Sequence, residues 1–186
     1  MPTPAKTSRP ELVAIARRLV EASGPDALTV SAVAQSAGVK APSLYKHFAD
    51  RAALLKACEI EILHELEATL RRETKGDSPR ARLISMAAAY RRFGKAAPNR
   101  YRVIYSGNAF TDPEIREACL FSAQPLFDEL RAAGIAEDRV LPVSRTMVPF
   151  LHGFVLMEIG SAFNLGGDVD EAFELGLETI LAGVPR

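Results

Sequence analysis

The stretch LTVSAVAQSAGVKAPSLYKHF, residues 28–48, predicts two short helices joined by a tight turn. Thr29 lies where its side chain can cap the first helix. The apolar residues of that helix share one face at helical spacing: Val30, Val33, Ala34 and Ala37. Gly38 then provides the left-handed conformation in which helices commonly end. The second helix is expected to run from about Ala41 to Phe48.

A longer helix is predicted on each side of this pair. The preceding helix has Ser8 and Glu11 at capping-box spacing, and Gly24-Pro25 ends it. Its apolar residues fall on one face: Leu12, Ile15, Ala16, Leu19 and Val20. Asp50 caps the following helix, which is expected to reach about Lys75. Two short helices joined by a glycine-containing turn and packed on a preceding helix make a helix-turn-helix.

The second short helix has an apolar stripe and a polar arc. On a helical wheel, Leu44, Phe48 and Ala41 form the inward stripe. The outward arc holds the other residues, with the first and last at its margins: Tyr45, Pro42, Lys46, Ser43 and His47. A helix about 10–12 Å wide fits the B-DNA major groove, which is about 12 Å wide. The middle of the arc is therefore expected to face base edges, and its margins the phosphates.

Charge is distributed unevenly along this neutral chain. Residues 1–60 hold eight Lys/Arg and five Asp/Glu, a net of +3, whereas residues 61–186 hold fifteen and eighteen, a net of −3. From pattern alone, an exposed Tyr-Lys-His run is more often a solvated helix face than a nucleic-acid contact. Residues 38–49 contain no carboxylate, and phosphate repels carboxylates. Together with the glycine turn and the first-turn Pro42, this favours contact with DNA.

Residues 28–55, LTVSAVAQSAGVKAPSLYKHFADRAALL, resemble the DNA-binding region of the TetR family of one-component bacterial transcription regulators. The resemblance covers about the first 60 residues. It implies phosphate contacts from four residues: Thr29, Tyr45, His47 and Arg51. It implies base or near-base contacts from five: Lys40, Ala41, Pro42, Ser43 and Lys46. A cation at a helix start, such as Arg51, opposes the helix dipole, so an anionic group is expected nearby.

The remaining sequence is also expected to be helical. Three pairs indicate helix starts with Pro in the first turn: Ser78-Pro79, Ala97-Pro98 and Asp112-Pro113. A long helix is expected over residues 139–164, and a last one over residues 169–182 after LGGD. The prediction is an all-α fold of about nine helices. Residues 1–50 would form a helix-turn-helix domain, and residues 51–186 a helical ligand-binding and dimerisation domain.

The resemblance implies a homodimer in which the last two helices of each subunit form a four-helix bundle. Apolar residues there exceed what one helix needs to bury: Met147, Phe150, Phe154, Leu156, Met157 and Phe163. The alternative for any one of them is an intramolecular core. The segment PFLHGFVLMEIG resembles that of a TetR subgroup in which a Trp precedes a His-Gly pair. Here Val148 stands in the place of that Trp.

A ligand pocket is predicted from prolines inside helices. Pro125 and Pro149 would each free the carbonyl four residues earlier, and such kinks open space between helices. The candidate lining residues are mostly aromatic, although many could be ordinary core: Phe93, Tyr101, Tyr105, Phe110, Phe121, Phe127, Arg145, Met147, Phe150 and His152. The effector would be small and largely apolar.

Other classes of function find less support in the sequence. Ser43 and Lys46 match the S-x-x-K motif of serine β-lactamases, but the K-T-G and S-D-N partners do not follow. Glu61 and His64 form one E-x-x-H motif, whereas a di-iron site needs two copies of that motif. We therefore expect no enzyme, metal or cofactor. The runner-up is a helical small-molecule-binding or scaffold protein that has lost DNA binding.

The expected setting is the cytoplasm. The sequence has no signal-peptide pattern, and its apolar runs are shorter than the ~20 residues of a membrane span. Cys58 and Cys119 are too few for a disulfide framework and are expected to be reduced. The expected partners are double-stranded DNA with a palindromic operator, a second copy of the chain and an unknown small-molecule effector.

Overall fold

The computed structural model describes residues 8–104 and 111–182. Over these residues every regular element is helical, with nine α-helices and one short 3-10 helix. This confirms the all-α prediction. The chain divides into two compact units, Met1–Leu63 with Ala97–Cys119, and His64–Ala96 with Leu120–Arg186. We call them the first unit and the second unit.

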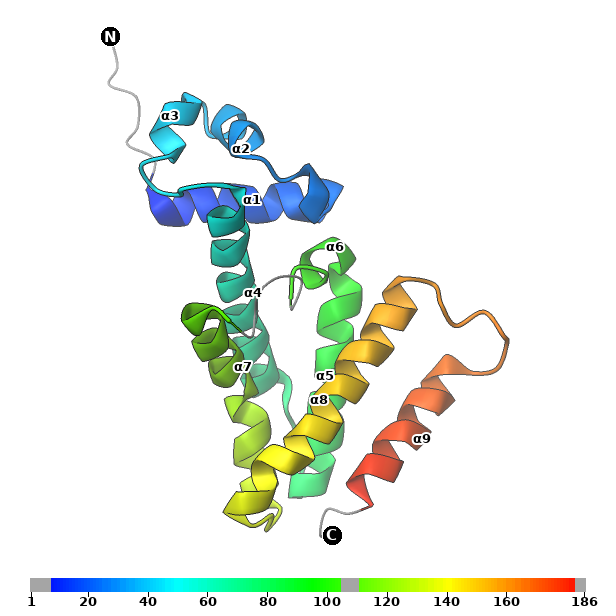
Figure 1. Ribbon diagram of the computed structural model, residues 1–186. Coiled ribbons are helices and arrows are strands. Elements are labelled where there is room, and N and C mark those ends of the chain that lie inside the picture. The colour runs from blue at the N-terminus through cyan, green and yellow to red at the C-terminus, as the bar shows by residue number, and fades with distance from the viewer. Residues whose placement is uncertain (1–7, 105–110, 183–186) are drawn as a thin grey trace. The chain divides into compact units, whose positions relative to one another are not determined.

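The first unit contains the short helices at the start of the chain (Figure 1). Its complete elements are α1 (Arg9–Ser23), η1 (Pro25–Ala27), α2 (Val30–Ser36), α3 (Ala41–Leu44) and α6 (Pro98–Tyr101). It also includes the beginnings of α4 (Arg51–Glu73) and α7 (Pro113–Ala132). Helix α1 packs against α2 and α6, and α2 packs against α3.

Local capping sets most helix boundaries in the first unit. The capping box of α1 forms in both directions, with Glu11 N donating to Ser8 Oγ at 3.4 Å and Ser8 N to Glu11 Oε2 at 2.7 Å. Thr29 Oγ1 accepts from the Ala32 amide at 3.0 Å and caps α2. Gly24 and Gly38 have φ of 81° and 67°, which ends the helices before them. These sequence predictions are confirmed.

Helix α3 is shorter than predicted. It ends at Leu44 rather than Phe48, and residues 45–47 form a turn. The Leu44 carbonyl accepts from both the His47 amide at 2.8 Å and the Phe48 amide at 2.9 Å. Sharing one carbonyl tightens the last turn toward 3-10 geometry, which is common at helix ends. Side chains of residues 45–47 therefore leave the ideal helical wheel.

The core of the helix-turn-helix is apolar and follows the predicted stripes. Leu44 is 0% and Phe48 2% exposed, whereas Ala41 is only partly buried. Around them lie buried residues of the preceding elements: Leu12, Val13, Ala16, Val20, Leu28, Val30, Val33 and Ala34. Ile15 and Leu19 remain partly exposed at the edge of the α1 face.

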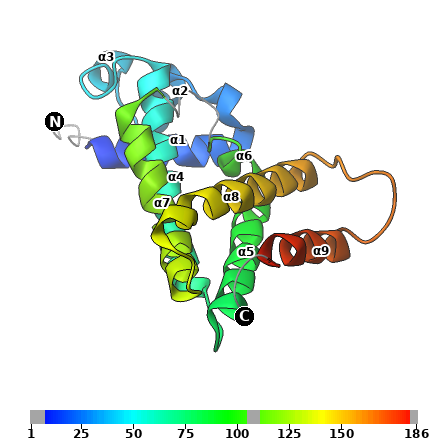
Figure 2. The same ribbon diagram turned by 60° about the horizontal axis from the view of Figure 1, so that its bottom comes forward.

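The second unit is built from longer helices. It contains the ends of α4 and α7, with α5 (Pro79–Ala96), α8 (Glu137–Ile159) and α9 (Val169–Leu181). Helix α5 packs against α8 and α9, and these two pack against each other, as both views show (Figures 1 and 2). The predicted starts at Pro79, Pro98 and Pro113 are confirmed.

Helix α8 ends five residues before the predicted limit. The Ala162 amide donates to Met157 O at 2.8 Å and the Ser161 amide to Glu158 O at 3.0 Å, with Ser161 at φ 54°. This pair of bonds around a left-handed residue is a Schellman motif. The terminator was missed because Ser is a less obvious left-handed residue than Gly.

Helix α8 is also long and apolar enough to cross a membrane, judged by length and composition only. Its most apolar window has a mean hydropathy of 1.4, and 28% of that window is buried. One such helix is weak evidence for a membrane span, because the core helix of a soluble protein can have the same composition. Here α8 packs against both α5 and α9.

Candidate nucleic-acid interface and ligand pocket

The polar arc predicted for the recognition segment, residues 40–47, is exposed. Tyr45 is 57% exposed although it is a large aromatic residue. The other exposed members are Lys40, Pro42, Ser43, Lys46 and His47. An aromatic ring held in water beside a lysine and an imidazole gives a surface rich in hydrogen-bond donors.

The two lysines of this segment have no carboxylate counter-ion in the part of the chain that the structure describes. Within the described residues, neither Lys40 nor Lys46 lies within 4.0 Å of a carboxylate oxygen. Leu44 and Phe48 anchor the segment in the core and so fix which side chains face outward. An anion approaching this face would have no carboxylate to displace from either ammonium group.

Thr29 is exposed and already has a structural role. Its Oγ1 accepts the Ala32 amide, which leaves the hydroxyl hydrogen free to donate. The predicted phosphate contact from Thr29 is therefore compatible with its capping role.

Arg51 lies at the start of α4 and uses its guanidinium within the protein. Its Nε donates to Leu28 O at 2.7 Å, and its Nη2 donates to Pro25 O at 2.6 Å. These acceptors are neutral carbonyl oxygens, and the anionic neighbour expected from the helix dipole stays a prediction. These bonds tie the start of α4 to the segment before α2. A phosphate contact from Arg51 stays a prediction.

The predicted ligand-binding residues lie in different surroundings. Tyr105 and Phe110 are outside the described residues. Tyr101, in the first unit, and Phe93 and Met147, in the second, are buried. Phe127 and His152 are partly buried, whereas Phe121 and Arg145 are exposed. Burial lowers the pKa of His152, which favours the neutral imidazole.

Phe150 belongs to an aromatic cluster that joins α8 to α9. Its ring stacks on Phe173 with centroids 5.7 Å apart, and Phe154 meets Phe173 edge-on at 5.0 Å. Phe163, beyond the end of α8, packs on Phe154 at 4.8 Å. Phe150, proposed from sequence as a ligand contact, thus has a packing role between the two helices.

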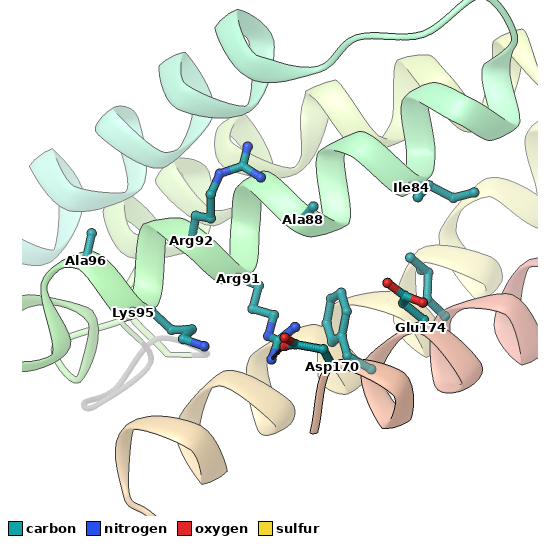
Figure 3. Close-up of a pocket in the computed structure, with 10 residues that line it drawn as sticks. Ile84, Ala88, Arg91, Arg92, Lys95, Ala96, Asp170 and Glu174 are labelled. Atoms are coloured by element: carbon teal, nitrogen blue, oxygen red, sulfur yellow. Dashed lines mark hydrogen bonds and ion pairs between the residues drawn. The ribbon is translucent and has the colours of Figure 1, made fainter. Parts of the chain in front are cut away.

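A cavity of about 650 Å³ lies between α5 and α9 (Figure 3). Its lining contains both apolar and charged residues: Ile84, Ala88, Arg91, Arg92, Lys95, Ala96, Asp170, Phe173, Glu174 and Leu177. None of these residues was predicted as a ligand contact. The α5 members recur at helical spacing, but sequence periodicity gives no sign that α9 faces them.

Arg91 lies in the lining of this cavity and pairs with two carboxylates. Its Nε and Nη2 donate to the two Glu158 carboxylate oxygens at 2.6 and 2.7 Å, and Nη2 also reaches Asp170 Oδ1 at 2.6 Å. Figure 3 shows the Arg91 and Asp170 side chains meeting between α5 and α9. The guanidinium also lies over the Phe173 ring at 4.7 Å. Arg91 therefore links α5 to α8 and α9.

The Glu158 carboxylate is stabilised in its charged form. Its side chain is 7% exposed, and burial alone would raise its pKa. Hydrogen bonds from Arg91 and Lys95 outweigh that effect, so the pKa of Glu158 is lowered. The pKa of Arg91 is raised, chiefly by its hydrogen bond to Glu158.

The catalytic motifs considered from sequence lie on open surfaces. Ser43 and Lys46 are exposed on the recognition segment, and Glu61 and His64 are exposed on α4. The His64 ring meets the Phe121 ring edge-on at 5.0 Å. No group of three His, Cys, Asp or Glu that could hold a metal ion occurs in the described part of the chain.

Sequence models of known families match both regions of the chain. The model described as "Bacterial regulatory proteins, tetR family" matches residues 12–58, and "Tetracyclin repressor-like, C-terminal domain" matches residues 83–180. The chain is 30% identical over 190 residues to the uncharacterized HTH-type transcriptional regulator Rv0681 of Mycobacterium tuberculosis. That match covers 98% of this chain and 84% of that protein.

Solved structures are also similar to this chain over most of its length. A protein of unknown function from Rhodococcus sp. RHA1 is similar with a TM-score of 0.79 and 26% identity, over 96% of this chain and 95% of that chain. A TetR variant from Acinetobacter baumannii AYE, in complex with minocycline, is similar with a TM-score of 0.71 and 27% identity, over 95% of both chains.

The fold and the exposed recognition segment define a helix-turn-helix transcription regulator. The chain belongs to the TetR family. Proteins of this family bind DNA, form dimers and bind small molecules, and they are regulators rather than enzymes.

Proposed function

We propose that this protein is a homodimeric repressor that binds a palindromic operator and is released from it by a small, largely apolar ligand. The observation that carries the proposal is the exposed recognition segment, whose lysines have no carboxylate partner among the described residues. We assign DNA binding to residues 1–50, and effector binding and dimerisation to residues 51–186. The cytoplasm is the corresponding location.

The DNA contacts follow the resemblance to the TetR family. Lys40, Ala41, Pro42, Ser43 and Lys46 would face base edges. Thr29, Tyr45, His47 and Arg51 would contact phosphates. Support comes from the burial of Leu44 and Phe48, which leaves the opposite side of the segment to solvent. Lys46 is the residue best suited to read a base, because a lysine can donate to guanine O6 and N7.

Dimerisation is proposed through the exposed apolar surface of α8 and α9. Its large residues include Leu156 on α8 and Leu175 on α9, 38% and 68% exposed. Met157, next to Leu156, and Leu141, nearer the start of α8, are also exposed. A second copy would bury this surface around a two-fold axis. Two recognition segments related by that axis require an inverted repeat, with half-sites separated by one helical turn of about 34–36 Å or a multiple.

Release by a ligand is a population shift between two dimer states. A ligand that binds more tightly to the state with misplaced recognition segments lowers DNA affinity, and DNA lowers ligand affinity equally. The TetR variant similar to this chain was solved with minocycline bound, which supports a small-molecule effector. Phe93, Phe127, Met147 and neutral His152 are the described second-unit residues proposed to receive it.

Selection of bound sequences from a random DNA pool tests this proposal. The expected result is an enriched inverted repeat, bound by a dimer. Enrichment of no sequence by well-folded protein would contradict the DNA-binding role and favour a protein that keeps the fold without binding DNA. Enrichment of a single half-site by a monomer would contradict the proposed symmetry.

A further inference from the structure

Two arginines of the helix-turn-helix differ in how they use their guanidinium groups. Arg51, the predicted phosphate contact, donates to the Leu28 and Pro25 carbonyls. Arg9 is exposed at the first position of α1 and makes no hydrogen bond or ion pair within the described residues. The two groups therefore differ in their availability to an external anion.

Arg9 is held beside the recognition segment by an aromatic contact. Its guanidinium carbon lies 5.2 Å from the centroid of the Phe48 ring, within the range of a cation–π interaction. Phe48 is 2% exposed and directly follows His47, at the end of the segment that carries Lys46 and Tyr45. A core residue thus fixes the place of an exposed cation.

Glu11, the acidic residue in the same helical turn, is already engaged. Glu11 Oε2 accepts from Ser8 N at 2.7 Å and from Ser8 Oγ at 2.9 Å. These hydrogen bonds lower the pKa of Glu11, which stays charged but committed to Ser8. Arg9 also lies at a helix start, where the dipole disfavours a cation. An external anion would relieve that cost.

We propose that Arg9, positioned by Phe48, is a further DNA-binding residue that contacts a backbone phosphate beside the recognition segment. The inference rests on the proposed DNA-binding function. The N–H donors of Arg9 make no hydrogen bond within the described residues, and a guanidinium can donate to two phosphate oxygens at once. Arg9 would add to the proposed phosphate contact from Arg51, whose guanidinium already donates to two carbonyl groups.

Arg18 provides a matched control on the same helix. It is exposed on α1, has no ion pair among the described residues, and lies nine residues after Arg9. Nine residues are about two and a half helical turns, so Arg18 points away from the side of Arg9. Arg9→Gln and Arg18→Gln remove the same charge from the full-length protein.

The measurement is the slope of log affinity against log salt concentration for the selected double-stranded DNA. Each lost phosphate contact reduces the magnitude of the slope by about 0.9. Arg9→Gln should therefore lower it by about 1 per subunit, about 2 for a dimer on a palindrome. Arg18→Gln should leave the slope unchanged. Arg9→Lys keeps the positive charge and should retain most of the wild-type slope. The preferred sequence should not change.

The outcomes separate this inference from the function on which it rests. If the wild-type protein shows no salt-dependent DNA binding, the proposed function fails and the inference fails with it. If the wild-type protein binds DNA with a steep salt slope and both Arg9→Gln and Arg18→Gln show the same slope, only the inference fails. A loss of thermal stability in Arg9→Gln with an unchanged slope would also overturn it, because Arg9 would then serve only to support Phe48.

Discussion

The second unit and the helix-turn-helix differ in how their lysine and arginine side chains are paired. In the second unit, most Lys and Arg side chains are paired with carboxylates: Arg71, Arg72, Arg80, Arg82, Arg91, Arg92, Lys95 and Arg131. In the helix-turn-helix, Arg9, Lys40 and Lys46 have no such partner in the described ranges. The second-unit cations that link helices are paired with carboxylates, whereas Arg9, Lys40 and Lys46 have no carboxylate partner among the described residues.

The first unit does form ion pairs away from the recognition segment. Lys56 on α4 contacts Asp112 at 2.7 Å and Glu114 at 3.2 Å, at the start of α7. Among the described residues, Lys75, Arg139 and Arg145 show that a second-unit cation can also lack a carboxylate partner. Lack of a partner is therefore informative only where several such cations share one exposed, carboxylate-free surface.

The largest effect is expected where a paired cation is most buried. Arg91→Met leaves Glu158, 7% exposed, without its bidentate partner and should lower the free energy of unfolding by about 3 kcal/mol. Arg92→Met, in the next position of α5, removes a pair with Glu73 from a side chain that is 61% exposed. That control should cost under about 1 kcal/mol. Urea denaturation monitored by circular dichroism compares them.

If Arg91→Met and Arg92→Met lower the free energy of unfolding equally, the structural role of the Arg91–Glu158 pair is contradicted. The pH dependence sharpens the test. Because the pKa of Glu158 is lowered in the folded state, its contribution is present above the ordinary Glu range and is lost as pH falls through the folded pKa. The difference in stability between wild-type protein and Glu158→Gln should therefore narrow on acidification.

A cation without a partner should affect binding rather than folding. Lys46→Ala should weaken operator binding by about 1–3 kcal/mol and relax the preference at one operator position. Lys95→Ala removes a lysine that is paired with Glu158 at 2.7 Å and should leave operator binding unchanged. Titration against a panel of single-base operator variants tests both. Uniform weakening over all sequences would place Lys46 at a phosphate instead.

Close packing between α8 and α9 gives a test that involves no charge. A Cβ added at Gly176 would lie 2.5 Å from Phe150 Cε2, and that ring is stacked on Phe173. Gly176→Ala should therefore destabilise the protein by about 1–3 kcal/mol. Gly153→Ala, where a Cβ meets nothing within 4 Å, should stabilise α8 by about 0.5–1 kcal/mol. Thermal melts with the same sign for both variants would contradict this packing.

The smallest effect is expected for a single neutral donor. Tyr45 is 57% exposed, so Tyr45→Phe should leave stability nearly unchanged and weaken operator binding by about 1 kcal/mol. The consensus sequence should stay the same, because a phosphate contact reads no base. Repeating the selection with this variant checks the assignment, and a changed consensus would move Tyr45 to a base edge.

Local structure was predictable because its causes are close in sequence. The Ser8–Glu11 capping box, the Thr29 cap and the Gly38 turn each depend on a few neighbouring residues. The predicted ends of α3 and α8 were wrong. Helix α3 ends early where two amides share the Leu44 carbonyl, and α8 ends early at the left-handed Ser161. Exposure of the recognition segment was also predictable, since Leu44 and Phe48 share the spacing of a buried stripe.

Partners distant in sequence were not predictable. Arg51 is 23 and 26 residues from its carbonyl acceptors, and Arg91 is 67 residues from Glu158. No periodic pattern indicates which helix faces which, so neither these contacts nor the cavity between α5 and α9 could be found from one sequence. The contact of Arg9 with the Phe48 ring was missed for the same reason.

The salt dependence of wild-type DNA binding tests the central claim most directly, using one duplex carrying the selected inverted repeat and one of scrambled sequence. Available lysines and arginines on the helix-turn-helix predict that affinity for both duplexes falls steeply and linearly on a log–log plot as salt rises, with the repeat bound more tightly throughout. If the protein does not bind DNA, or if its DNA affinity does not change with salt concentration, these cations do not contact the DNA phosphates.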